Sequence, residues 1–128
     1  MNGEDIQTLI DKTRTYYDSI GRVWCPVLNS FVYFTSEGTR HMLYKTNRKK
    51  RPVAEQKYKM ALLKPAIRVL KSKNSTIATW RLNDDSDLDY IAVICDIPDR
   101  MRKKNMIRVI IKRTSDGQFN YHSVMRHG

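Results

Sequence analysis

The last strand pair constrains the fold of this chain most. Residues 106–126 read MIRVIIKRTSDGQFNYHSVMR, with a β-rich run on either side of Asp116-Gly117. An Asp-Gly dipeptide between two such runs favours a two-residue type I′ turn, and that turn fixes which residues of the two strands face each other. The predicted register pairs Lys112 with Tyr121, Ile110 with Ser123, and Arg108 with Met125.

Side chains alternate between the two faces of a strand, so this register divides the hairpin into two different faces. One face combines two cations with a phenol and a hydroxyl; it carries Arg108, Ile110, Lys112, Thr114, Phe119, Tyr121, Ser123 and Met125. These polar groups would each need a partner if they were buried, so we expect a solvated face that meets an anion. The opposite face should receive helices; it carries Ile107, Val109, Ile111, Asn120, His122 and Val124.

Helical patterns precede most of the strand patterns. Apolar residues at helical spacing predict helices over residues 3–20, over 36–45 with Ser36 as the cap, and over 53–72 with a break or kink at Lys64-Pro65. Strand patterns occupy residues 22–25, 30–34, 75–82 and 88–97 before the terminal pair. The sequence therefore predicts one α+β domain over residues 1–128, with N-terminal helices packed on one face of a C-terminal four-stranded antiparallel meander. The two early strands form either a hairpin of their own or an edge addition to that sheet.

The chain is strongly basic, with 24 Lys and Arg against 13 Asp and Glu and a net charge of +11. Small basic proteins usually bind nucleic acid or an anionic membrane, because they neutralise many phosphates at once and release their counterions. No apolar run approaches the roughly 20 residues that span a bilayer, and the N-terminus has no signal-peptide core. We therefore expect a cytoplasmic protein that binds nucleic acid and no membrane. Cys25 and Cys95 lack zinc-ligand spacing, so we expect no metal and no other cofactor.

The basic residues are concentrated in the middle of the chain, where residues 38–82 contain Glu55 as their single acid. Residues 45–52 have the pattern of a mobile basic loop. Cations at helical spacing would form one stripe if the following helix continues through the proline; they are Lys57, Lys64, Arg68 and Lys71. We predict a sequence-independent contact with the nucleic-acid backbone, made by Arg40, Arg48, Lys49, Lys50, Arg51, Lys57, Lys64 and Arg68. The alternative is a solvated face without a partner.

A catalytic hypothesis rests on one histidine and the polar hairpin face. A metal-free ribonuclease needs a base for the ribose 2′-hydroxyl, an acid for the departing 5′-oxygen, and cations for the charge on the pentavalent phosphate. His41 titrates near neutrality and could be the base, with Lys45 four residues later on the same helix face. The phosphate would be held and oriented by Arg108, Lys112, Ser123 and Tyr121. Alternatively, His41 is an ordinary surface histidine and the cations are solvated.

Other titratable residues are assigned structural roles. The predicted register places His122 on the face opposite to Ser123, which favours packing or exposure over catalysis. His127 lies at the terminus, where chains fray. Four clustered acids are candidates for binding magnesium; they are Asp84, Asp85, Asp87 and Asp89. Because this turn lacks the glycine of a calcium loop, we interpret the four acids as solvated.

Two segments of the chain, FVYFTSEGTRHMLYK and the terminal IRVIIKR with FNYHSVM, resemble the barnase, EndoU, colicin and RelE superfamily of metal-independent ribonucleases. The resemblance covers about residues 31–126 and implies a helix histidine that works with basic and hydroxyl residues of the sheet, here His41, Arg108, Lys112 and Ser123. It also implies in-line attack of the 2′-hydroxyl, which leaves a 2′,3′-cyclic phosphate and a 5′-hydroxyl, and a toxin that a partner protein inhibits.

The chain departs from individual branches of that superfamily. Barnase uses a glutamate base on the sheet and a late histidine, and neither has an assigned counterpart here. RelE-like members lack the histidine and depend on Lys, Arg and Tyr, so Lys45 or Tyr121 could replace one of the residues chosen above.

The first hypothesis is therefore a small endoribonuclease that acts on tRNA, on mRNA at the ribosome or on free RNA. The alternative is a non-catalytic RNA- or DNA-binding module, in which Tyr121 or Phe119 stacks on a base. A third possibility is a basic adaptor that binds an acidic protein.

Overall fold

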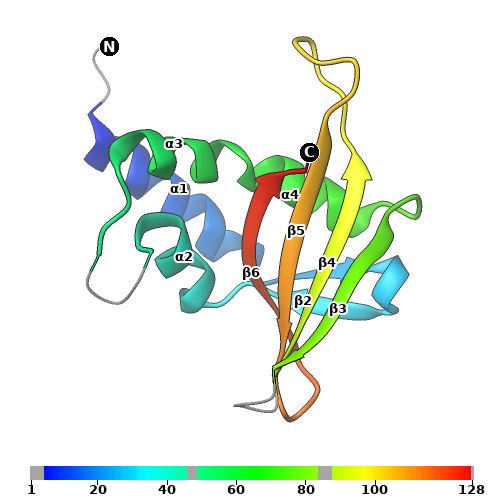
Figure 1. The fold of residues 1–128 in the computed structure, drawn as a ribbon. Helices are drawn as coiled ribbons and strands as arrows, with labels where there is room; N and C mark the ends of the chain where they lie inside the picture. The colour runs from blue at the N-terminus through cyan, green and yellow to red at the C-terminus, as the bar shows by residue number, and fades with distance from the viewer. Residues whose placement is uncertain (1–4, 46–48, 84–87, 128) are drawn as a thin grey trace.

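In the computed structural model, which describes residues 5–45, 49–83 and 88–127, helices pack on one face of a mixed sheet (Figure 1). The helices are α1 (Ile6–Ile20), α2 (Ser36–Leu43), α3 (Val53–Ala61) and α4 (Leu63–Lys71), with a short 3-10 helix η1 (Pro26–Leu28). The strands are β1 (Arg22–Cys25), β2 (Ser30–Tyr33), β3 (Thr76–Asn83), β4 (Leu88–Asp96), β5 (Met106–Arg113) and β6 (Phe119–Arg126). The predicted α+β class is confirmed.

The sheet has six strands in the order β1-β2-β6-β5-β4-β3. Strands β3 to β6 follow one another antiparallel, as predicted. The sheet as a whole is mixed and is not a four-stranded antiparallel meander, because the two early strands join it, which was one of the two arrangements left open for them. The hairpin of β1 and β2 extends the sheet, and β2 runs parallel to β6 through two residue pairs, Val32 with Phe119 and Tyr33 with Asn120. The chain between these two strands is long enough for a parallel pairing, since it runs through α2, α3, α4 and strands β3 to β5.

The predicted helix over residues 53–72 is two helices, and the break lies at Leu62 rather than at Lys64-Pro65. Leu62 has φ −88° and ψ −3°, outside regular helical geometry. Pro65 falls in the first turn of α4, where its missing N–H would have had no acceptor within the helix. The predicted cation stripe is therefore divided, with Lys57 on α3 and Lys64 and Arg68 on α4.

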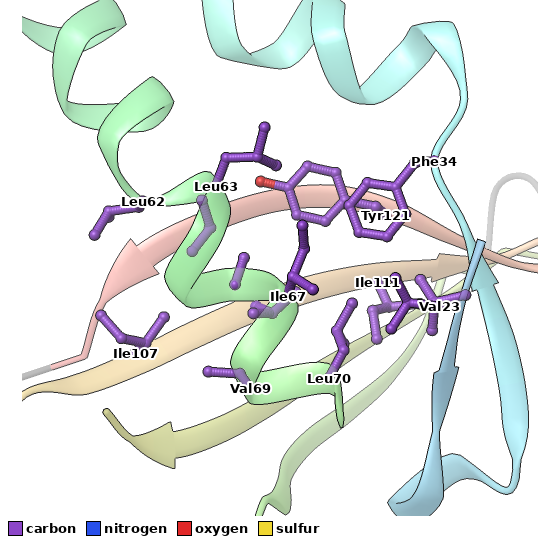
Figure 2. Packing of buried hydrophobic residues seen from close by; sticks show 14 of the residues in the cluster. Val23, Phe34, Leu62, Leu63, Ile67, Val69, Leu70, Ile107, Ile111 and Tyr121 are labelled. Atoms are coloured by element: carbon purple, nitrogen blue, oxygen red, sulfur yellow. The ribbon is translucent and has the colours of Figure 1, made fainter. Parts of the chain in front are cut away.

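The core lies between α4 and the sheet (Figure 2). Ile67 and Leu70 of α4 face Ile107 and Ile111 of β5, and Val23 of β1 closes the same cluster. Buried and less buried residues alternate along β5, which confirms its predicted apolar face. Full burial of one such aliphatic side chain contributes about 1.5–3 kcal/mol, so this layer supplies much of the stability that holds the sheet in shape.

The terminal hairpin has a different turn from the predicted type I′. Gly117 has a φ of 90°, but Asp116 is not among the described residues with positive φ, and a type I′ turn needs both. Instead, the Gly117 N–H donates to Thr114 O at 2.9 Å and the Thr114 N–H donates to Gln118 O at 2.9 Å. The loop between the paired Thr114 and Gln118 thus holds three residues, the usual hairpin alternative with a glycine at its last position.

This turn shifts the register by one residue near the loop, and a bulge at His122 then reverses the shift. Lys112 was predicted to pair with Tyr121 but pairs with Asn120. Beyond the bulge the predicted pairs are confirmed: Ile110 pairs with Ser123, and Arg108 with Met125. The extra residue of a bulge changes which side chains face each side of the sheet.

Four face assignments from the sequence were therefore wrong. Asn120 pairs with Lys112 and lies on the polar face, whereas Phe119 packs against the core. Tyr121 points into the helix layer, where it is 1% exposed and its ring stacks on Phe34 with a centroid distance of 4.8 Å. Tyr17 is a third ring of this cluster, 6.2 Å from Tyr121. His122 instead lies on the polar face, beside Ser123.

Candidate functional site

Two adjoining hollows lie on the polar face of β4, β5 and β6 and share Tyr90 and His122 in their walls. The larger has a volume of about 460 Å³ and includes Arg108 and Ser123. The smaller, of about 260 Å³, includes His41. Five of the six residues predicted to be catalytic therefore line these adjoining hollows; they are His41, Lys45, Arg108, Lys112 and Ser123.

Helix α2 reaches this region because β2 is short. The two pairs of β2 with β6 end at Tyr33 and Asn120, and α2 then packs beside the remaining part of β6 (Figure 1). Gly38 permits the close approach, because a Cβ atom there would clash with the Tyr17 hydroxyl and would lie 2.8 Å from Cδ2 of Tyr121.

An ion pair between Glu37 and Lys112 joins α2 to β5. Lys112 Nζ donates to Glu37 Oε1 at 2.8 Å, and this hydrogen bond is the main cause that lowers the pKa of the Glu37 carboxyl. His41 lies one helical turn after Glu37, with its Nε2 3.9 Å from the same oxygen. The sequence reasoning missed Glu37, although its spacing of four residues from His41 on a helix could have revealed it.

The two histidines of the site are in contact, with ring centroids 3.9 Å apart. Burial is the main cause that lowers the pKa of His41, and the Glu37 carboxylate opposes it. Burial and then the neighbouring His41 lower the pKa of His122 to about 4. Both rings are therefore neutral near pH 7, so each can accept a proton. The Nδ1 atom of His122 is buried and has no hydrogen-bond partner among the described residues.

A buried lysine of α3 lines the larger hollow. Lys59 is 9% exposed, and its Nζ donates to Val124 O at 2.9 Å and to Ser123 Oγ at 3.1 Å. It satisfies a carbonyl on the edge of β6 that β2 does not reach, and the Tyr58 hydroxyl accepts from the Arg126 N–H at 2.8 Å on the same edge. Burial is the main cause that lowers the pKa of Lys59. The sequence reasoning missed this residue, because no sequence pattern marks Lys59 as the buried lysine of α3.

The segment that follows α2 brings Arg51 to the site. The prediction that Lys45 shares a helix face with His41 was wrong, because α2 ends at Leu43. Lys45 Nζ instead lies 3.3 Å from Glu55, which also pairs with Arg51 at 3.0 Å. Arg51 Nε donates to His41 O at 2.8 Å and so fixes the end of α2.

The predicted basic loop over residues 45–52 makes backbone hydrogen bonds where the structure describes it. Tyr44 forms a β-bridge with Lys50, and the Arg51 N–H donates to Leu43 O at 2.7 Å. Arg48 lies outside the described residues.

The predicted nucleic-acid contacts divide between two sides of the molecule. Arg40 lines the smaller hollow, and Lys49, Lys50 and Lys57 are exposed. Lys64 and Arg68 are exposed on α4, whose opposite side packs on the sheet, so the structure does not bring them to the hollows. Three of the acids predicted to be solvated lie outside the described residues; they are Asp84, Asp85 and Asp87.

Glu37, His41 and His122 offer one ligand atom each, and these atoms lie within 4.8 Å of one another. Two imidazoles and a carboxylate are donors that zinc and iron accept. However, the Lys112 ammonium already binds the Glu37 carboxylate, and Arg51, Lys59 and Arg108 line the adjoining hollow. This concentration of positive charge opposes a metal ion and favours an anion such as a phosphate.

Comparisons with known protein families, with curated proteins and with solved structures find no match for this chain. Among the described residues, no helix has the length and apolar character required to cross a membrane.

Proposed function

We propose that this protein is a small endoribonuclease that cleaves RNA without a metal ion, by attack of the ribose 2′-hydroxyl. The observation that carries the proposal is the arrangement around His41. Its ring, neutral near pH 7, contacts His122 next to a Glu37 carboxylate that Lys112 keeps ionised. Acceptors for a proton and donors for a phosphate thus line one region, as this reaction requires.

His41 is the general base in this proposal. It takes the proton of the 2′-hydroxyl while the 2′-oxygen attacks phosphorus, and the imidazolium that forms lies beside the Glu37 carboxylate, 3.9 Å away. Such a carboxylate stabilises the charged ring, as the orienting acid of a catalytic triad does. His122 packs against His41 and keeps water from one side of it.

In this proposal the phosphate binds where the two hollows adjoin. Arg108 of the larger hollow and Lys112 of the smaller one neutralise the charge that develops on the pentavalent phosphorus, and Ser123 orients a phosphate oxygen. As the bond from phosphorus to the 5′-oxygen breaks, Lys59 supplies the proton that this oxygen needs, because a lowered pKa makes its ammonium a better donor than an exposed lysine. The products are a 2′,3′-cyclic phosphate and a 5′-hydroxyl. Lys45 assists from the rim of the smaller hollow.

The substrate class is RNA, as tRNA, ribosome-bound mRNA or free RNA, and the net charge of +11 supports association with its backbone. In this proposal the protein acts in the cytoplasm as a toxin, and a cognate inhibitor protein covers the cationic hollow.

The test is incubation of purified protein with total RNA and with one defined tRNA, in the presence of EDTA. His41→Ala should lower cleavage by at least about 100-fold, the usual contribution of a general base, whereas the exposed His127→Ala should cleave like the wild type. The fragments should carry cyclic phosphate ends. Intact RNA that shifts on a gel with a steep salt dependence would refute the enzyme and favour a non-catalytic binding module.

A further inference from the structure

An aromatic patch lies on the β1–β2 hairpin, outside the hollows described above. Trp24 is 46% exposed, and its ring makes an edge contact with Phe31 at a centroid distance of 5.1 Å. The Arg22 guanidinium lies 4.0 Å from the centre of the Phe31 ring. Val23 and Val32 of the same strands point into the core, so the alternation of the strands turns these aromatic side chains to the opposite face.

A hollow of about 370 Å³ adjoins the patch. Trp24, Phe31 and Tyr33 supply aromatic walls, and the amides of Asn29 and Gln118 supply donors and acceptors. The rim also includes Asp116, whose carboxyl has a lowered pKa because Thr114 donates a hydrogen bond to it. A carboxylate repels the phosphates of a nucleic acid but can accept from the amino groups of bases, so this chemistry suits a nucleobase better than a backbone.

A row of paired residues connects the patch with the proposed catalytic site. Tyr33 pairs with Asn120, Asn120 pairs with Lys112, and Lys112 pairs with Tyr90. Paired residues point to the same face, and each step between strands is about 4.8 Å, so Tyr33 lies roughly 10 Å along the sheet from Lys112. A dinucleotide centred on the phosphate at Lys112 would not extend to Trp24, whereas a longer single strand would.

We propose that the patch of Trp24, Phe31 and Tyr33 is a stacking subsite for an unpaired base of the RNA, a few nucleotides from the scissile phosphate. This inference rests on the proposed ribonuclease function and adds that the substrate is single-stranded at that position. The exposed indole offers the stacking plane, and Arg22, which lies over the adjoining Phe31 ring, adds a positive charge for the neighbouring phosphate.

The experiment measures the affinity of a 2′-O-methyl oligoribonucleotide of about eight nucleotides, a length within the usual range of single-strand sites, which cannot be cleaved. Loss of one stacked base should weaken binding by about 5- to 150-fold in Trp24→Ala. Trp24→Phe keeps an aromatic plane and should bind close to the wild type. Met101→Ala is the matched control, because Met101 is an apolar side chain that is 89% exposed and lies outside the patch.

Cleavage of a dinucleotide, which is too short for the patch, should be unchanged in Trp24→Ala. Equal affinity of Trp24→Ala and wild type for the longer strand would overturn the subsite, as would failure of Trp24→Phe to restore binding. An equal loss for the dinucleotide would overturn it too, by showing damage to the whole site. If binding of the long strand depends on Trp24 but no RNA is cleaved, the ribonuclease proposal fails and the subsite stands. If RNA is cleaved but Trp24→Ala changes neither its binding nor its cleavage, the subsite fails and the ribonuclease proposal stands.

Discussion

Acidification should destabilise this protein through His122. In the folded protein its pKa is lowered from 6.5 to about 4, chiefly because its ring is buried and next because His41 lies beside it. The unfolded chain takes up the proton near pH 6.5, and the folded protein does so only near pH 4. The stability that depends on neutral His122 is therefore complete above pH 6.5 and is lost progressively as the pH falls toward 4.

The size of the effect follows from the same pKa. If the whole difference between 6.5 and about 4 counted, the loss would be roughly 3 kcal/mol, at about 1.4 kcal/mol for each factor of ten. The ring is partly exposed, so solvent screening reduces the expected loss to about 1–2 kcal/mol. His122→Gln removes the titrating group and keeps a polar side chain of similar reach.

The assay is urea unfolding, followed by tryptophan fluorescence at about pH 7 and about pH 4.5. The free energy of unfolding should fall between these pH values by about 1–2 kcal/mol less in His122→Gln than in the wild type, since the remaining acids and His41 titrate in both proteins. His127→Gln, which changes an exposed histidine away from the site, should behave like the wild type. Equal falls in wild type and His122→Gln would refute the reasoning.

Three further substitutions test the packing around the site. Tyr121→Phe removes a buried hydroxyl that has no partner among the described residues, so urea unfolding should show unchanged stability or a gain of up to about 1 kcal/mol, with RNA cleavage intact; lost cleavage would return Tyr121 to the catalytic candidates. Gly38→Ala should cost about 1–3 kcal/mol in the same assay, because its Cβ would clash with the Tyr17 hydroxyl, and wild-type stability would contradict the close approach of α2. Lys59→Met keeps the apolar stem but removes the ammonium, so single-turnover cleavage should fall by about 100-fold or more, and an unchanged rate would exclude Lys59 as the acid.

Local pattern was sufficient for the elements but not for their order in the sheet. The alternation along residues 106–113 predicted β5 and its buried face, and Gly21 marked the end of α1, where its φ is 67°. The parallel contact of β2 with β6 joins residues that are far apart in the sequence and has no local signal. It matters for function, because the short β2 leaves the edge of β6 open to α2.

The candidate site was predicted in its residue types and only partly in its members. His41, Arg108, Lys112 and Ser123 were chosen for their chemistry, and the structure brings them to adjoining hollows. Lys59 was missed because a lysine on a helix is normally solvated, and its burial here depends on an unpaired carbonyl of a strand 65 residues later in the chain. Charge counts along the sequence cannot distinguish this lysine from Lys64 or Arg68.

The largest error has one local cause, the choice between two turns that the same Asp-Gly sequence permits. A two-residue loop would have paired Lys112 with Tyr121 and turned the tyrosine to the polar face; a three-residue loop moves every pair near the turn by one residue. Had the strands continued in that shifted register, Ser123 would have turned into the core with its hydroxyl. The bulge at His122 prevents this, because it restores the original pairing at Ile110 and Ser123. One turn and one bulge together thus bury a phenol that the sequence offered as catalytic and place a histidine against His41, which no count of residue types could have decided.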